Sequence, residues 1–144
     1  MDTPLLSHYG VSDPHIDSIT AHYQAIGVNK PTTMYLAASP EYAMKRLLAA
    51  NSGCIYQITK AFRNGELGRH HNPEFTLLEW YRIGYDHHTL MDEVQQLVQL
   101  ILGPLDIVRL TYRQAFLKIL QIDPFNICTQ ALQQVASEQL DCSL

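Results

Sequence analysis

Two stretches near the middle of the chain alternate in character at every second position. Residues 54–63 and 74–83 follow the period of a strand, whose successive side chains point to opposite faces. A polar loop with Gly65 and Gly68 joins them, which predicts a long antiparallel hairpin. One face would carry Gln57, Thr59, Ala61 and Arg63 with Phe75, Leu77, Glu79 and Tyr81, and the other Tyr56, Ile58, Lys60 and Phe62 with Thr76, Leu78, Trp80 and Arg82.

The segment before this hairpin is less regular. Proline and glycine interrupt residues 1–31, which predicts a loop-rich segment with one short strand. Residues 32–38 then form a strand-like run that ends at Ser39-Pro40-Glu41. We expect a helix there, with Ser39 as its N-cap and Pro40 at its first position, that stops near Gly53.

The segment after the hairpin is predicted to be helical. A helix over residues 89–102 would be capped by Thr89, and Gly103 would end it. A second helix begins at Thr111, where Gln114 completes a capping box, and a weaker one covers residues 129 to about 140. The sequence contains no internal repeat and no obvious linker. We therefore predict a single α+β domain over residues 1–144.

Composition narrows the functional classes. The 144 residues carry a net charge of −4, which argues against a broad nucleic-acid-binding face. No apolar run approaches the length of a membrane span, and no signal peptide is evident. The cysteines Cys54, Cys128 and Cys142 form no disulfide pattern, so we expect a cytoplasmic protein. The histidines lack ligand-like spacing, and we predict no metal site among them.

The hairpin loop carries the candidate chemistry. Arg63 ends one strand, a basic loop follows, and Phe75 begins the returning strand. A guanidinium can hold a phosphate and an aromatic ring can stack on a purine, while Glu79 and Tyr81 could receive an amine. The same residue types also fit a solvated turn over a packed core, so residue types alone leave both interpretations open.

The order of the whole segment resembles a known motif. Phe62-Arg63-Asn64, then after six residues His71-Asn72-Pro73-Glu74-Phe75-Thr76, Glu79 and Tyr81, is similar to motif 2 of class II aminoacyl-tRNA synthetases of the lysyl, aspartyl and asparaginyl group. Residues 39–48, 68–82, 85–86, 90–94 and 112–117 fit the lysyl branch. They most resemble its paralogues that attach β-lysine to elongation factor P.

This resemblance implies a fold and a set of site residues. The fold would be part of the antiparallel sheet of these enzymes, flanked by helices. Motif 2 would occupy about residues 55–82, with the end of motif 1 before it and a helical insertion region after about residue 88. The nucleotide residues would be Arg63 on the α-phosphate, Phe75 on adenine, and Asn64, Gly65, His71 and Asn72 in the loop. The amino-acid pocket would include Ser39, Pro40, Glu41 and Tyr81. These four have structural alternatives, since Ser39-Pro40-Glu41 is a sufficient helix start and Tyr81 could simply pack in the sheet.

The implied reaction is activation of lysine or β-lysine with ATP and Mg²⁺, followed by transfer to a lysine of elongation factor P. The family forms homodimers. Two alternatives are a fragment of a lysyl-tRNA synthetase that charges tRNA, which we favour less, and a non-catalytic remnant of a split or broken gene.

The chain also departs from the family pattern. Gly65 stands where the family has a nucleotide-contacting Glu. No glycine-rich third motif is present, so its arginine and the magnesium ligands would lie outside this chain. We therefore expect residues 1–144 alone to be inactive.

Overall fold

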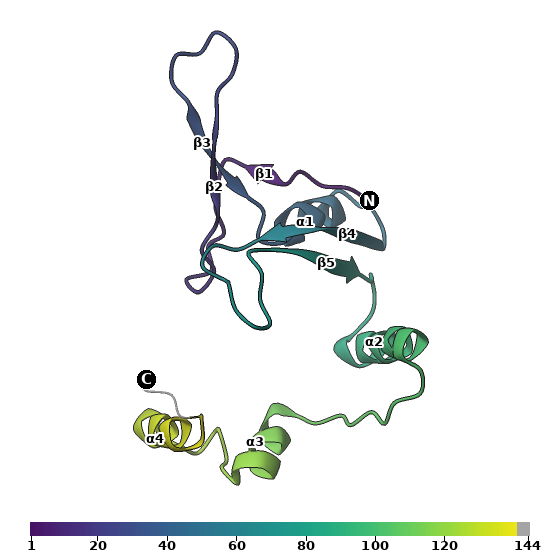
Figure 1. The fold of residues 1–144 in the computed structure, drawn as a ribbon. Coiled ribbons are helices and arrows are strands. Elements are labelled where there is room, and N and C mark those ends of the chain that lie inside the picture. Colours follow the sequence, from purple (N-terminus) through teal and green to yellow (C-terminus); the bar gives the residue numbers. More distant parts are fainter. Residues whose placement is uncertain (141–144) are drawn as a thin grey trace. The chain divides into compact units, whose positions relative to one another are not determined.

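The computed structural model describes residues 1–140, in which antiparallel strands combine with helices, as the predicted α+β class requires (Figure 1). The chain divides into two compact units, Met1–Met91 and Asp92–Leu144. Each unit is described by itself. The predicted single domain over residues 1–144 stays a prediction.

The first unit contains a small three-stranded sheet in the order β1-β3-β2. Its strands are β1 (Leu6–Ser7), β2 (Thr20–Tyr23) and β3 (Thr32–Leu36), all antiparallel. The prediction of one strand before residue 32 was wrong, because there are two. Both lie against β3, so the pairing partner rather than the weak local pattern makes these residues extended.

The second sheet is the predicted hairpin. Strand β4 (Ile55–Phe62) pairs with β5 (Glu74–Tyr81), and the register places Gln57 opposite Glu79 and Ala61 opposite Phe75. The ladder extends past β4, because the backbone N–H of Arg63 donates to Pro73 at 2.9 Å. The predicted faces are confirmed. Gln57 and Ala61 are buried on one face, whereas Tyr56 and Ile58 are exposed on the other.

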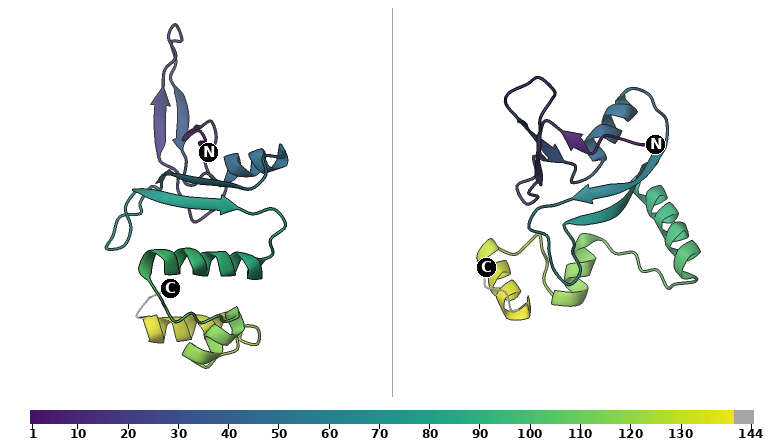
Figure 2. Two further views of the ribbon diagram at one scale, coloured as in Figure 1. Left: turned by 90° about the vertical axis from the view of Figure 1, so that its right-hand side faces the viewer. Right: turned by 45° about the horizontal axis from the view of Figure 1, so that its top comes forward.

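Helix α1 (Glu41–Ala49) lies beside this hairpin and contributes Met44, which is fully buried (Figures 1 and 2). The helix begins one residue later than predicted. Pro40 occupies the N-cap position, where it has no N–H to leave unpaired. Ser39 still accepts a hydrogen bond from the Glu41 N–H, at 3.1 Å. A backbone bond from Phe62 to Ala37 ties β4 to the end of β3.

Helix α2 (His87–Leu102) begins in the first unit, and α3 (Tyr112–Leu120) and α4 (Thr129–Leu140) belong to the second. The capping box of Thr111 and Gln114 is confirmed. The predicted cap of α2 was wrong by one turn. Asp86, not Thr89, caps it, because the Asp86 carboxylate accepts from both the N–H and the hydroxyl of Thr89, at 2.8 Å each. No helix within residues 1–140 is sufficiently long and apolar to cross a membrane.

Candidate functional site

Arg63 lies at the end of β4 with its guanidinium over the ring of Phe75. The Cζ atom is 5.2 Å from the ring centroid, and Nε donates to the Ala38 carbonyl at 3.4 Å. Nη1 is 3.7 Å from Oε1 of Glu66, and the side chain is 28% exposed. Arg63 and Phe75 therefore share one face of the hairpin, as the alternation predicted. A guanidinium that is oriented but still accessible can receive an anion.

The loop after Arg63 is anchored by a residue that the sequence did not indicate. The backbone N–H of Asn64 donates to the Asp17 carbonyl at 2.9 Å, and its side-chain amide donates to the Asp17 carboxylate at 2.7 Å. Asn64 thus holds the start of the loop. Direct contact between Asn64 and a nucleotide stays a prediction. No local signal could have revealed Asp17, which is 47 residues away in the sequence.

The rest of the loop is exposed. Gly65 has a φ of +73°, a left-handed conformation that glycine adopts without strain. Gly68 and His71 pair with each other through their backbones, at 3.0 and 3.3 Å, and close the tip. His71 and Asn72 are both exposed at the surface. Their roles toward a nucleotide stay predictions.

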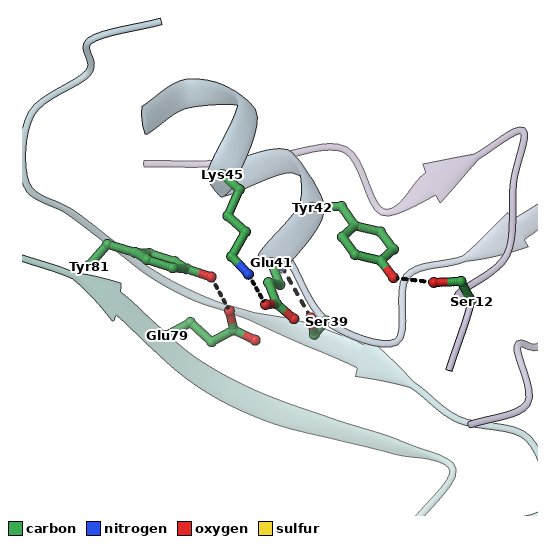
Figure 3. Close-up of polar contacts among 7 residues, drawn as sticks. All are labelled: Ser12, Ser39, Glu41, Tyr42, Lys45, Glu79 and Tyr81. Atoms are coloured by element: carbon green, nitrogen blue, oxygen red, sulfur yellow. Dashed lines mark hydrogen bonds and ion pairs between the residues drawn. The ribbon is translucent and has the colours of Figure 1, made fainter. Parts of the chain in front are cut away.

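At the other end of the same face, four side chains form a polar cluster, which we call the amine cluster: Glu41, Lys45, Glu79 and Tyr81 (Figure 3). The Tyr81 hydroxyl donates to Oε2 of Glu79 at 3.3 Å. Lys45 Nζ donates to Oε1 of Glu41 at 2.5 Å. Two carboxylates with a hydroxyl donor between helix and sheet can bind a cation, as the amine of an amino acid would require.

Charge and burial in this cluster perturb Tyr81 and Lys45. Burial, with the negative charges of Glu79 and Glu41, raises the pKa of Tyr81 to about 12. The hydrogen bond to Glu41 raises the pKa of Lys45 above its ordinary value, and the charges of Glu41, Tyr42 and Glu79 act in the same direction. Tyr81 therefore remains a neutral hydrogen-bond donor at physiological pH.

The three residues predicted at the start of α1 line a cavity of about 660 Å³. Ser39, Pro40 and Glu41 face it together with residues of the N-terminal segment and of β3. Arg63, Phe75 and Tyr81 lie on the hairpin face and are not part of this lining. Glu41 belongs both to the cavity lining and to the amine cluster, so it links the two.

A buried hydrogen bond between Thr3 and Gln57 was also not predicted from the sequence. Gln57 is 1% exposed and sits opposite Glu79 in the ladder. Its Oε1 accepts from the Thr3 hydroxyl at 3.0 Å, while its Nε2 has no partner among residues 1–140. The sequence did offer one signal. Gln57 lies at an inward-facing position of a strand, and a buried polar group normally has a hydrogen-bond partner.

The comparisons with known proteins agree with the motif. Residues 1–133 match the family model described as tRNA synthetases class II (D, K and N). The chain belongs to this class II synthetase family.

Curated relatives include the elongation factor P–(R)-β-lysine ligases of Vibrio campbellii, Vibrio vulnificus and Yersinia enterocolitica. The chain is 51% identical to the first over 138 residues, which cover 96% of this chain and 43% of the relative. The second is 52% identical over 137 residues, covering 95% and 42%. The third is 49% identical over 143 residues, covering 99% and 44%. This class II chain thus spans somewhat less than half the length of these relatives.

The class II chain provides no metal centre in the part that the structure describes. Within residues 1–140, no group of three or more His, Cys, Asp or Glu side chains is placed to hold a metal ion. That the Mg²⁺ ligands lie outside residues 1–144 stays a prediction, as do the individual roles of the site residues named above.

Proposed function

We propose that this chain is the front part of an ATP-dependent ligase that activates lysine or β-lysine and transfers it to a lysine side chain of elongation factor P. The observation that supports this best is that two different kinds of site lie at opposite ends of one face of the β4–β5 hairpin. Arg63 over Phe75 lies at one end, and Glu79 with Tyr81 lies at the other. An anion site and a cation site on one rigid surface suit a substrate pair that is phosphate at one end and amine at the other.

In the first step, a carboxylate oxygen of the amino acid attacks the α-phosphorus of ATP. The new P–O bond forms as the bond to pyrophosphate breaks, giving an aminoacyl-adenylate. Arg63 would stabilise the charge that builds on the α-phosphate, and Phe75 would stack on the adenine. The carboxylates of Glu41 and Glu79 would hold the amine end, and the neutral hydroxyl of Tyr81 would orient Glu79.

In the second step, the amine of the acceptor lysine attacks the carbonyl carbon of the adenylate. An amide bond forms, AMP leaves, and the ammonium proton is released. The relatives named as elongation factor P–(R)-β-lysine ligases support elongation factor P as the acceptor, and tRNA is the less favoured alternative. A homodimeric state, which the resemblance implies, and a cytoplasmic location, which the cysteine pattern favours, belong to this proposal.

A chimera tests the proposal. Residues 1–144 replace the matching segment of the Vibrio campbellii relative, and the purified protein is assayed for lysine-dependent or β-lysine-dependent pyrophosphate exchange. Transfer of radiolabelled amino acid is then compared between elongation factor P and tRNA. We expect exchange by the chimera, label on elongation factor P, and no exchange by residues 1–144 alone. A folded chimera without amino-acid-dependent exchange would contradict the proposal, and label on tRNA would reassign the acceptor.

A further inference from the structure

The ammonium group of Lys45 already lies in the amine cluster. Its Nζ is 2.5 Å from Oε1 of Glu41, and the negative charge of Glu79 reaches it as well. Figure 3 shows Lys45 and Glu41 projecting from α1 on the side where Glu79 and Tyr81 project from β5. A protein cation thus sits where the proposed function requires the cation of a substrate.

We propose that Lys45 is a replaceable counter-ion of the amine cluster. It neutralises Glu41 when no amino acid is bound, and the ammonium of an incoming amino acid displaces it. This inference rests on the proposed function, because it assigns a specificity-determining residue to the same site. A ligand without an ammonium group cannot replace Lys45, so the amine cluster selects for amines.

The geometry makes the Lys45 contact easy to exchange. Glu41 and Lys45 are four residues apart on one helix, and their side chains are 46% and 58% exposed. Exposed pairs of this kind contribute little to stability, because water solvates both charges and two long side chains lose freedom. Lys45 can therefore swing into solvent at small cost when another cation takes its place.

Lys45 is the cation that the cluster itself supplies. Figure 3 shows its ammonium group beside the Glu41 carboxylate, on the side of α1 where Glu79 and Tyr81 project from β5. Lys45 therefore occupies a position that a substrate ammonium could take.

A second ion pair provides a matched control. Lys60 Nζ is 3.2 Å from Oε1 of Glu74, and the two side chains are 52% and 55% exposed. This pair lies on the opposite face of the hairpin from Glu79. Lys60→Gln removes the same charge as Lys45→Gln from a pair of similar exposure, but outside the amine cluster.

The test is titration calorimetry on the chimera, and on its Lys45→Gln and Lys60→Gln variants, with L-lysine and with hexanoate, which has a carboxylate and an alkyl chain but no ammonium. Lys45→Gln should bind L-lysine about two- to fivefold more tightly than the unmodified chimera, since the competing ammonium is gone. Hexanoate affinity should not rise. Lys60→Gln should leave both affinities unchanged. In the unmodified chimera, saturation with L-lysine should increase the acetylation rate of Lys45, read by mass spectrometry, but not that of Lys60.

The outcomes separate this inference from the proposed function. If the unmodified chimera binds L-lysine, but Lys45→Gln binds it no more tightly and Lys45 acetylation does not change, Lys45 is not the counter-ion and the proposed amine cluster stands. If neither the chimera nor its Lys45→Gln variant binds L-lysine, the counter-ion inference is overturned, whereas the proposed function is decided separately by pyrophosphate exchange of the chimera.

Discussion

Asn64 donates two hydrogen bonds to Asp17, one from its backbone N–H at 2.9 Å and one from its side-chain amide at 2.7 Å. The two bonds attach the first residue of the motif 2 loop to the segment that precedes β2. Because Arg63 is the adjacent residue, the same contacts help to fix the backbone from which its guanidinium reaches the ring of Phe75.

Replacing Asp17 should therefore loosen the loop. Asp17→Ala removes the carboxylate but keeps the backbone carbonyl, so we expect a loss of about 0.5–1.5 kcal/mol in the free energy of unfolding, measured in urea. Asp17→Asn, which keeps an acceptor oxygen, should lose less. Equal stability of Asp17→Ala and the wild type would show that the side-chain bond contributes nothing.

Gly65→Glu would restore the Glu that the resemblance to the family implies at this position. In the chimera, we expect tighter ATP binding by about 0.5–3 kcal/mol, because a charged hydrogen-bonding group is added. Nothing lies within 4 Å of the added Cβ, but the φ of +73° is strained for a side chain. Stability should therefore fall by about 1–2 kcal/mol.

Gly65→Ala separates these two effects, because it introduces the strain without the carboxylate. Calorimetric titration with ATP and thermal unfolding should be measured on both variants. Weaker or unchanged ATP binding by Gly65→Glu, relative to Gly65→Ala, would refute a nucleotide contact at this position.

The buried pair of Thr3 and Gln57 predicts non-additive stability. Thr3→Val leaves the Gln57 amide without its hydrogen bond in a buried site, and should cost about 1–3 kcal/mol. Gln57→Leu added to Thr3→Val removes the unpaired amide and should recover part of that loss. A double-mutant cycle from urea unfolding measures the coupling, and strictly additive effects would mean that the two residues act independently.

The raised pKa of Tyr81 predicts a loss of stability in alkali. Its folded-state pKa of about 12 lies above the ordinary value of 10.0, so the folded protein holds the phenolic proton more tightly than the unfolded chain. This contribution is fully present below pH 10 and is lost as the pH rises toward 12. Other tyrosines also ionise there, so the measurement is the difference in unfolding free energy between wild type and Tyr81→Phe across this range. A difference that does not change with pH would contradict the assignment.

Structural features that depend on residues close together in the sequence could be predicted. Features that depend on contacts between residues far apart in the sequence could not. The faces of β4 and β5 follow from alternation, and the Thr111 capping box from a spacing of three residues. The additional strand before residue 32 depends on β3 as a partner. At α2, Asp86 and Thr89 were both capable caps, and the sequence does not show which of them accepts the bond.

In the candidate site, too, local arrangements could be predicted from the sequence, whereas contacts between distant residues could not. Arg63 and Phe75 were placed together because each lies at a known register of one hairpin. The Asp17–Asn64 and Thr3–Gln57 contacts join residues 47 and 54 positions apart, and the side of α1 that meets Glu79 and Tyr81 depends on how the helix lies against the hairpin. Such contacts follow from tertiary packing, which leaves no periodic signal in the sequence.

The role of Arg63 is the central claim, and pyrophosphate exchange by the chimera measures it most directly. A preorganised charge at a developing oxyanion commonly contributes two to three orders of magnitude in rate, so Arg63→Ala should lower the exchange rate about 10²–10³-fold. The KM for lysine should stay close to that of the unmodified chimera, since the amine cluster is at the other end of the face, and Lys60→Ala should leave the rate unchanged. An Arg63→Ala chimera that is folded and exchanges pyrophosphate at the rate of its parent would contradict the account.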